Sequence, residues 1–297
     1  MFAAALTTIL FSFSVIFGAR ATRVLGPRWA NLGRMTLATL LLAIWAHGFG
    51  SGFAGPGFAW FFLSGVIGFG LGDMALFGAL PRIGPRLAIL LTQCLAAPFG
   101  GLAEWVWLGT TLRVQEILWA GVILSGVAFA LAPDHGSTVA PRVFWIGVLC
   151  GVGSALGQAL GAVVSRKANA VNALADLTLD GGTAAYQRAV GGLLLTSLFA
   201  ALWWVSARRA KTPDPAPRWR EGWPLTVVNA LAGPTIGVAC YQWALRGNPS
   251  GVVLPIIATS PIVTMLFAWW LDGTRPTRRA LVGSFVAVLG VVGLGIS

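Results

Sequence analysis

The sequence is poor in charged residues, and this scarcity excludes most soluble folds. Charged side chains make up 10% of its 297 residues and hydrophobic ones 57%, whereas soluble domains carry roughly 25% charged residues. The mean hydropathy of +0.80 leaves too little polar surface to face water on all sides. We therefore expect an integral membrane protein that sits in a lipid bilayer.

Residues that carry catalysis and metal binding are also scarce. The chain has nine Asp and Glu residues, two His and three Cys. The cysteines (Cys94, Cys150 and Cys240) all lie in apolar stretches, and their odd number indicates neither a disulfide framework nor a metal site. No Gly-x-x-x-x-Gly-Lys-Ser/Thr motif occurs, which argues against an ATP-driven pump. We expect no metal, no cofactor, no catalytic residue and no enzymatic activity.

Basic residues outnumber acidic ones, giving a net charge of +11. In a soluble protein such a charge would suggest nucleic acid, but here the Lys and Arg residues sit in short loops, so no nucleic-acid partner is expected. Fourteen of the 20 lie in the first, third, fifth, seventh and ninth loops and four in the others. The positive-inside rule then predicts that these odd loops, including Arg208–Glu221, are cytoplasmic and that both termini are outside.

Ten apolar stretches have about the 20 residues that a spanning helix needs. They cover residues 2–19, 29–47, 58–80, 87–108, 115–132, 143–165, 183–205, 222–245, 251–271 and 279–296. The runs are continuous, whereas barrel strands would alternate apolar and polar residues. The sequence therefore predicts an all-α membrane protein with ten transmembrane helices.

The second half of the chain repeats the first. Ala79-Leu80 recurs as Ala244-Leu245 after 165 residues, and Gly126-Val127 as Gly290-Val291 after 164. We expect two five-helix repeats, at 1–132 and 143–297, joined by a linker at 133–142. Because each repeat has an odd number of helices, the second repeat enters the membrane from the opposite side, so the repeats are inverted. This doubling is typical of secondary transporters, and it is compatible with a functional monomer.

Further motifs are Gly72-Asp73, the turn 82–86, residues 157–161, Thr259-Ser260-Pro261 and the Gly283–Val291 pattern. In these motifs the chain resembles the EamA-type ten-helix transporters of the drug/metabolite transporter superfamily. The resemblance covers the whole chain and implies a multi-pass protein of the bacterial cytoplasmic membrane that transports small metabolites, often by export. Two departures are Thr110 and Thr274, where the family commonly has glutamate, so no role of that glutamate carries over.

Uncharged polar residues within the apolar runs are the candidates for a substrate pocket, because each needs a partner in a dry interior. Hydrogen bonding between helices is the alternative role. A deep tryptophan could stack on a small amphiphilic substrate. The candidate substrate-binding residues are Ser12, Ser14, Gln93, Gln158, Tyr241, Gln242, Trp243, Thr259 and Ser260.

Two acids are candidates for proton coupling. Asp73 lies within the third apolar stretch, where an ionised carboxylate facing lipid would cost roughly 2.5–3.5 kcal/mol. It could couple to protons, bind a substrate ammonium group or pair with Arg82 or Arg86. Glu104 lies near Trp105 and Trp107, and its simpler interpretation is a carboxylate that reaches the membrane interface.

Prolines and two arginines complete the candidate set. Pro98, Pro255 and Pro261 free backbone carbonyls at membrane depth, so we expect them to line a cavity or to kink a helix. Arg34 and Arg188 occupy matching places in the two halves, 154 residues apart. We expect them to reach lipid phosphates or cap helices, with attraction of a substrate carboxylate as the second interpretation.

The leading function is a secondary transporter that works by alternating access, with protons as the candidate coupling ion. A passive channel for small solutes is the nearer competitor, and it would show flux that does not saturate. A membrane enzyme that modifies lipids would need a convergent set of acids or histidines, which nine acids and two histidines scattered along the chain do not supply.

Overall fold

The computed structural model describes residues 2–108, 113–131, 140–209, 217–247, 256–273 and 275–296. All regular elements in these ranges are helical, and none is a strand. In the first repeat they are α1 (Phe2–Leu25), α2 (Pro27–Gly48), α3 (Phe58–Gly65), the π-helix η1 (Val66–Gly72), α4 (Asp73–Leu108) and α5 (Val114–Leu131).

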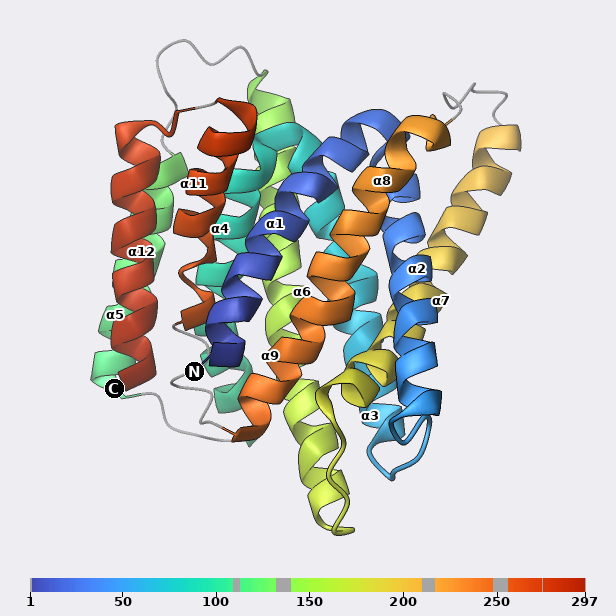
Figure 1. The fold of residues 1–297 in the computed structure, drawn as a ribbon. Coiled ribbons are helices and arrows are strands. Elements are labelled where there is room, and N and C mark those ends of the chain that lie inside the picture. The colour runs from blue at the N-terminus through green and yellow to red at the C-terminus, as the bar shows by residue number, and fades with distance from the viewer. Residues whose placement is uncertain are drawn as a thin grey trace.

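The second repeat has the matching set of helices. They are α6 (Pro141–Ala173), α7 (Gly181–Arg209), α8 (Trp219–Ala230), the π-helix η2 (Leu231–Thr235), α9 (Ile236–Gly247), α11 (Ser260–Asp272) and α12 (Arg278–Ile296). The first helices of the two repeats run in opposite directions in Figure 1, because α1 ends at the upper edge and α6 ends at the lower one. Both chain ends lie toward the lower edge.

Six helical segments among the described residues are long and apolar enough to cross a membrane. They are Phe2–Leu25, Phe58–Trp107, Pro141–Ala173, Gly181–Ser206, Trp219–Ala244 and Arg278–Ile296. The second of these, at 50 residues, is far longer than one crossing needs. Gly84 divides it with φ 72° and ψ 170°, a conformation that L side chains rarely adopt. The turn predicted at 82–86 is thus present.

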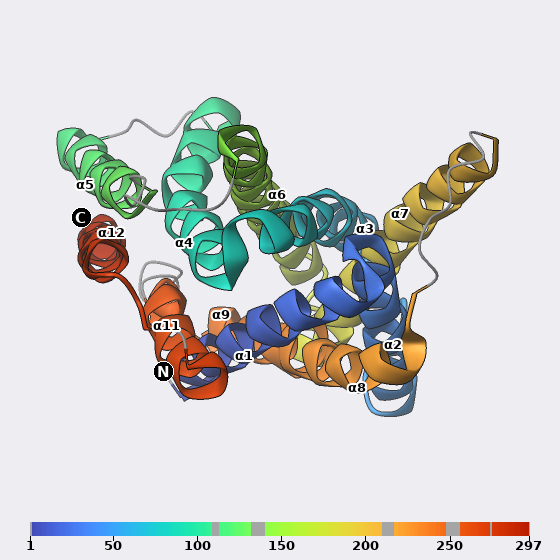
Figure 2. The ribbon, with the colours of Figure 1, turned by 90° about the horizontal axis from the view of Figure 1, so that it is seen from above.

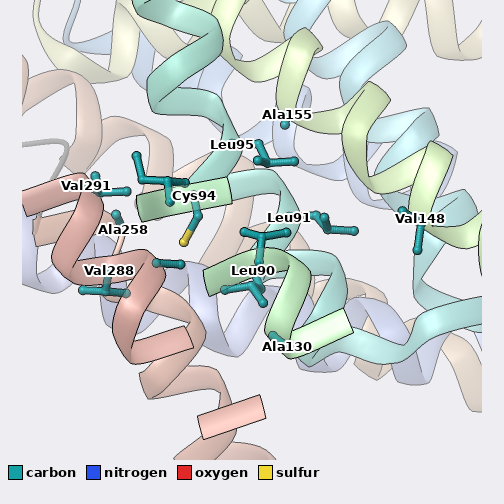
Figure 3. Close-up of a cluster of buried hydrophobic side chains, with 13 residues drawn as sticks. Leu90, Leu91, Cys94, Leu95, Ala130, Val148, Ala155, Ala258, Val288 and Val291 are labelled. Carbon is teal, nitrogen blue, oxygen red and sulfur yellow. The ribbon is translucent and has the colours of Figure 1, made fainter. Parts of the chain in front are cut away.

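The helices pack in two unequal groups when seen from above (Figure 2). α5 and α12, the last helices of the two repeats, pack on each other at one end of the molecule. A buried apolar cluster joins this pair to α4 and α6, and Leu90, Leu91, Cys94 and Val291 belong to it (Figure 3). The remaining helices form the larger group, in which α1 packs against α2, α4, α8, α9 and α11.

Glycines allow α6 to approach η1 at backbone distance. A Cβ built on Gly157 would lie 2.5 Å from the Cα of Gly72, and one on Gly161 would lie 3.1 Å from the Cα of Gly68. Glycines four residues apart thus face each other from both elements, which is the packing expected of a small-x-x-x-small ridge. This contact holds η1 against the second repeat.

Candidate functional site

A cavity of about 90 Å³ lies between the two repeats, and we call it the central cavity. Its lining includes residues from α1, α2, η1 and α4 in the first repeat and from α6, α8, η2 and α9 in the second. The lining residues used below are Phe11, Ser14, Val15, Arg34, Phe69, Asp73, Phe77, Thr92, Gln93, Gln158, Asn229, Gly233, Pro234 and Val238.

The two π-helices are related by the repeat. η1 begins at Val66 and η2 at Leu231, a separation of 165 residues that equals the separation of Ala79 and Ala244. Phe69 of η1 and Gly233 and Pro234 of η2 line the central cavity. Single-turn π segments inside α-helices are rare and often occur at functional sites. Their recurrence at one place in both repeats therefore marks the cavity as a candidate site.

An ion pair lies in the cavity wall. Nη2 of Arg34, on α2, donates to Oδ2 of Asp73, the first residue of α4. Nε of Arg34 also donates to Oδ1 of Asn31 at 3.3 Å, and the guanidinium lies 4.7 Å from the ring centroid of Phe77. The side chains of Arg34 and Asp73 are only 6% and 17% exposed, so the pair is largely removed from solvent.

The partners suggested for Asp73 by proximity in sequence are not the ones it has. Nη1 of Arg82 donates to the carbonyl of Gly78 at 2.5 Å, and Nη1 of Arg86 donates to the carbonyl of Arg275 at 3.2 Å. Arg34 was missed as a partner because it lies 39 residues away on another helix. The available signal was that one intramembrane acid and one intramembrane arginine occur in the same repeat.

Two hydrogen bonds cross the cavity between the repeats. Nε2 of Gln158 donates to Oε1 of Gln93 at 2.7 Å, which joins α6 to α4. Oγ of Ser14 donates to Oδ1 of Asn229 at 2.7 Å, which joins α1 to α8. The structure thus brings three of the candidate polar residues into the lining, and it adds Asn229.

Other candidates lie outside the lining of the cavity. Oγ of Ser12 donates to the carbonyl of Ser260 at 3.1 Å, so these two serines join α1 to α11, and Oγ1 of Thr259 donates to the carbonyl of Ile256 at 2.6 Å. Tyr241 packs on Phe11, with ring centroids 6.4 Å apart. Gln242 is buried, whereas Trp243 is 59% exposed and does not lie deep in the protein as expected.

The proline candidates do not line the cavity either. Pro98 lies half-buried within α4, and Pro261 stands in the first turn of α11, where a missing N–H donor leaves no broken helix bond. Residues 256–257 are helical and residues 258–259 form a turn, so Pro261 stands directly after a break between two helical segments. Pro255 and the side chain of Glu104 lie outside the described residues. The proline that does line the cavity is Pro234, in η2.

The contact with lipid phosphates expected for Arg34 and Arg188 is wrong, because both residues are only 5% exposed. The alternative role as a helix cap does not fit either, because each arginine lies two turns inside its helix. The charge of Arg34 is compensated by Asp73. The expected surface position was based on the short distance of Arg34 from the end of its helix, and that distance carries no information about a partner on another helix. Arg188 lies on α7 with its guanidinium 5.0 Å from the ring centroid of Phe69. Both arginines are thus part of the protein interior around the central cavity.

Comparisons with known proteins support the fold and identify the family. A crystal structure of a protein 19% identical in sequence superposes with a TM-score of 0.64, covering 98% of this chain and 94% of that chain. No curated protein matches the sequence. The model of the EamA-like transporter family matches twice, at residues 1–132 and 145–296. With both repeats matched over nearly its whole length, the chain belongs to the EamA-like transporter family, a group of membrane transporters of small solutes.

Proposed function

We propose that the protein is a secondary transporter that exports small metabolites, such as amino acids or related amphiphilic compounds, across the bacterial cytoplasmic membrane by alternating access. The observation that carries this proposal is the central cavity, whose lining comes from both repeats and includes both π-helices. Transporters built from inverted repeats place their substrate site at the interface of the repeats, near the middle of the membrane.

We propose ten membrane crossings. The segment Phe58–Trp107 reverses at Gly84 and supplies two crossings, so the six apolar segments give seven. α2, α5 and α11 bring the total to ten. Cysteines introduced at Glu221 and Ala175, whose side chains are exposed, lie beyond opposite ends of α7 and should therefore react from opposite sides. Reaction of the Glu221 position with an impermeant reagent on intact cells would reverse the proposed orientation.

The contacts across the cavity suggest what must change during a transport cycle. The hydrogen bonds Gln158–Gln93 and Ser14–Asn229 each join the two repeats. Relative movement of the repeats would break at least one of them and open the cavity toward one side. Asp73 remains the coupling candidate, with Glu104 as the second, because a change in the protonation of Asp73 would alter its ion pair with Arg34.

A flux experiment in proteoliposomes tests the proposal against a passive channel. Vesicles loaded with a panel of amino acids and their amine and carboxylate analogues are diluted into traces of the same labelled compound. A transporter gives transient accumulation of the label and saturable uptake for at least one compound. Uptake that rises linearly with concentration, without accumulation, would support the channel.

A matched pair of variants links the flux to the cavity. Gln158→Leu removes a polar group from the lining, and Gln115→Leu makes the same change at an exposed position on α5. We expect Gln158→Leu to lower the uptake rate at least tenfold and Gln115→Leu to leave it unchanged. Equal rates in the two variants would place the site elsewhere.

A further inference from the structure

Arg34 and Arg188 occupy the same place in the two repeats. α2 begins at Pro27 and α7 at Gly181, so each arginine is the eighth residue of its helix. Both are 5% exposed, and each guanidinium lies over a phenylalanine ring, at 4.7 Å for Phe77 and 5.0 Å for Phe69. The repeat has therefore placed one buried cation, Arg34, in the lining of the central cavity and a second, Arg188, against Phe69, which also lines it.

The two arginines differ in what faces them. Arg34 has the carboxylate of Asp73. The offset of 165 residues that relates η1 to η2 carries position 73 to position 238, which is a valine. Asp73 and Val238 both line the central cavity, and α7 packs against α9, the helix that holds Val238. The second repeat has thus kept the arginine and replaced its carboxylate by an apolar side chain.

The carboxylate of Asp73 is therefore shared between two guanidinium groups, those of Arg34 and Arg188. Asp73 interacts electrostatically with both Arg34 and Arg188, but its ion pair is with Arg34. Arg188 also interacts with the phenol of Tyr241, which carries no charge in its protonated form. Nε of Arg188 is buried and has no hydrogen-bond partner. Stacking on Phe69 compensates a buried cation only in part, and a buried charge without a counter-ion is unfavourable. The interior therefore has an excess of one positive charge at this place.

Other unpaired polar atoms close to the cavity are also donors. Nδ2 of Asn229, a lining residue, has no partner, and neither has Nδ2 of Asn31, whose Oδ1 accepts from Arg34. Oγ1 of Thr92, another lining residue, is also without a partner, and a hydroxyl can donate or accept. A ligand that satisfies the two amide groups must accept hydrogen bonds. A carboxylate provides two acceptor oxygens that match the fork of a guanidinium group.

We propose that the substrate carries a carboxylate, which supplies the second counter-ion and is bound through Arg188. This inference rests on the proposed transport function and adds the chemical class of the substrate. The apolar part of such a molecule lies against Phe11, Phe69 and Phe77 in the cavity lining. With two cations and two carboxylates the cluster becomes neutral, whereas a substrate that presents only an ammonium group would raise its charge further.

Three compounds of nearly equal shape test the charge requirement on the purified full-length chain. They are phenylacetate, phenylacetamide and phenethylamine, and sodium chloride and sodium phosphate at equal ionic strength report on inorganic anions. Binding to the native state raises the melting temperature. We expect phenylacetate to raise it by at least 3 °C at a concentration where the other additives raise it by less than 1 °C.

Substitutions at the two decisive positions make the test specific. Arg188→Met should abolish the response to phenylacetate and lower the melting temperature of the ligand-free protein far less than Asp73→Asn does, because Asp73 keeps its ion pair with Arg34. Val238→Asp supplies the carboxylate that the second repeat lacks, so it should also abolish the response. Val238→Asn introduces a side chain with the shape of aspartate but without its charge, so this variant should retain at least half of the response to phenylacetate.

The outcomes separate this inference from the proposed function. If phenethylamine or phenylacetamide stabilises the protein and phenylacetate does not, the carboxylate assignment is overturned while transport of small solutes stands. Equal stabilisation by chloride or phosphate also overturns it, and so does a full response in Arg188→Met. If Val238→Asp fails to fold, the Arg188→Met result decides. Flux in the proteoliposome assay is read independently, and its absence for every compound would contradict the transport function itself.

Discussion

Arg20 and Asp272 form an ion pair that ties the first repeat to the second, with 2.5 Å between Nη2 and Oδ1. The arginine lies near the end of α1 and the aspartate at the end of α11, and the same guanidinium group donates to the carbonyl of Leu271 at 3.1 Å. The side chains are 29% and 28% exposed, so the pair contributes only about 0.2–1 kcal/mol to folding. Because the pair joins the two repeats, we expect it to affect how often the repeats move apart and open the central cavity.

Breaking this pair should open the cavity toward that face more often. We expect Asp272→Asn to accelerate labelling of Val15→Cys, a position in the cavity lining, in a chain whose native cysteines have been replaced. The double variant Arg20→Asp/Asp272→Arg should restore slow labelling. Glu221→Gln, which breaks an exposed ion pair with Arg218 at the start of α8, serves as the control. Unchanged labelling in Asp272→Asn would remove the pair from the conformational change.

The pair Arg34–Asp73 should contribute to stability in a different way, because both partners are largely buried. Removing one partner of a buried pair costs about 3–5 kcal/mol, since the other charge is left uncompensated. We expect Asp73→Asn to lower the melting temperature strongly, and Arg34→Gln/Asp73→Asn to recover most of the loss. Melting curves in detergent measure both, and a double variant no more stable than Asp73→Asn would contradict the prediction.

The same residue tests proton coupling in liposomes. Asp73→Asn keeps the shape and part of the hydrogen bonding but removes the group that can take up a proton. We expect flux driven by a pH gradient to disappear while exchange of labelled substrate continues. If exchange and pH-driven flux fall together in a folded variant, Asp73 is a structural partner of Arg34 and does not couple transport to protons.

The helices and their doubling could be predicted because apolar length and repeated motifs are local signals. The turn at Gly84 was predicted from the resemblance of residues 82–86 to the family's turn and from the gap between the apolar stretches 58–80 and 87–108. The expected helix 251–271 is broken within its described part: residues 256–257 are helical, residues 258–259 form a turn, and α11 begins at Ser260. Hydropathy does not distinguish an apolar turn from an apolar helix.

The cavity could be predicted only in part, because its decisive contacts join distant residues. Gln93 and Gln158 stood out as polar groups in apolar runs, but Arg34 and Asp73 were considered separately. The π-helices leave no periodic signal, since each adds a single residue to a turn. The significance of Val238 could not be seen at all, because an apolar residue in an apolar helix becomes informative only when its repeat partner is known.

The contact between α6 and η1 leaves no room for a side chain at Gly157. A Cβ there would lie 2.5 Å from Cα and 2.9 Å from N of Gly72, and these backbone atoms cannot move without shifting η1. We expect Gly157→Ala to destabilise the protein by about 1–3 kcal/mol. Gly153→Ala is the matched control, because its nearest neighbour is the Cβ of Ala75 at 3.6 Å, and it should be neutral or stabilising. Equal melting temperatures for the two variants would refute the contact.

Asp180 caps the first turn of α7, just before the apolar segment that begins at Gly181. Its Oδ1 accepts from the backbone N–H groups of Gly182 and Thr183 at 2.9 and 3.0 Å and from Nε1 of Trp45 at 2.8 Å. Partial burial acts to raise the pKa of Asp180, but the hydrogen bonds from Thr183, Trp45 and Gly182 outweigh it, and the net pKa is lowered. The ionised carboxylate is therefore favoured in the folded state.

This cap gives a stability difference whose dependence on pH has a definite sign. Because the folded-state pKa is lowered, the contribution of Asp180 is complete above its ordinary pKa of about 3.9 and is lost as the pH falls through the folded-state value. We expect Asp180→Ala to cost about 0.5–2 kcal/mol at pH 7, as for other helix caps. The difference in melting temperature from the native chain should shrink at pH 3.5 and below. Asp176→Asn, in the same loop, controls for the loss of a negative charge, and a difference that stays constant down to pH 3 would show that the ionised carboxylate is not what stabilises the start of α7.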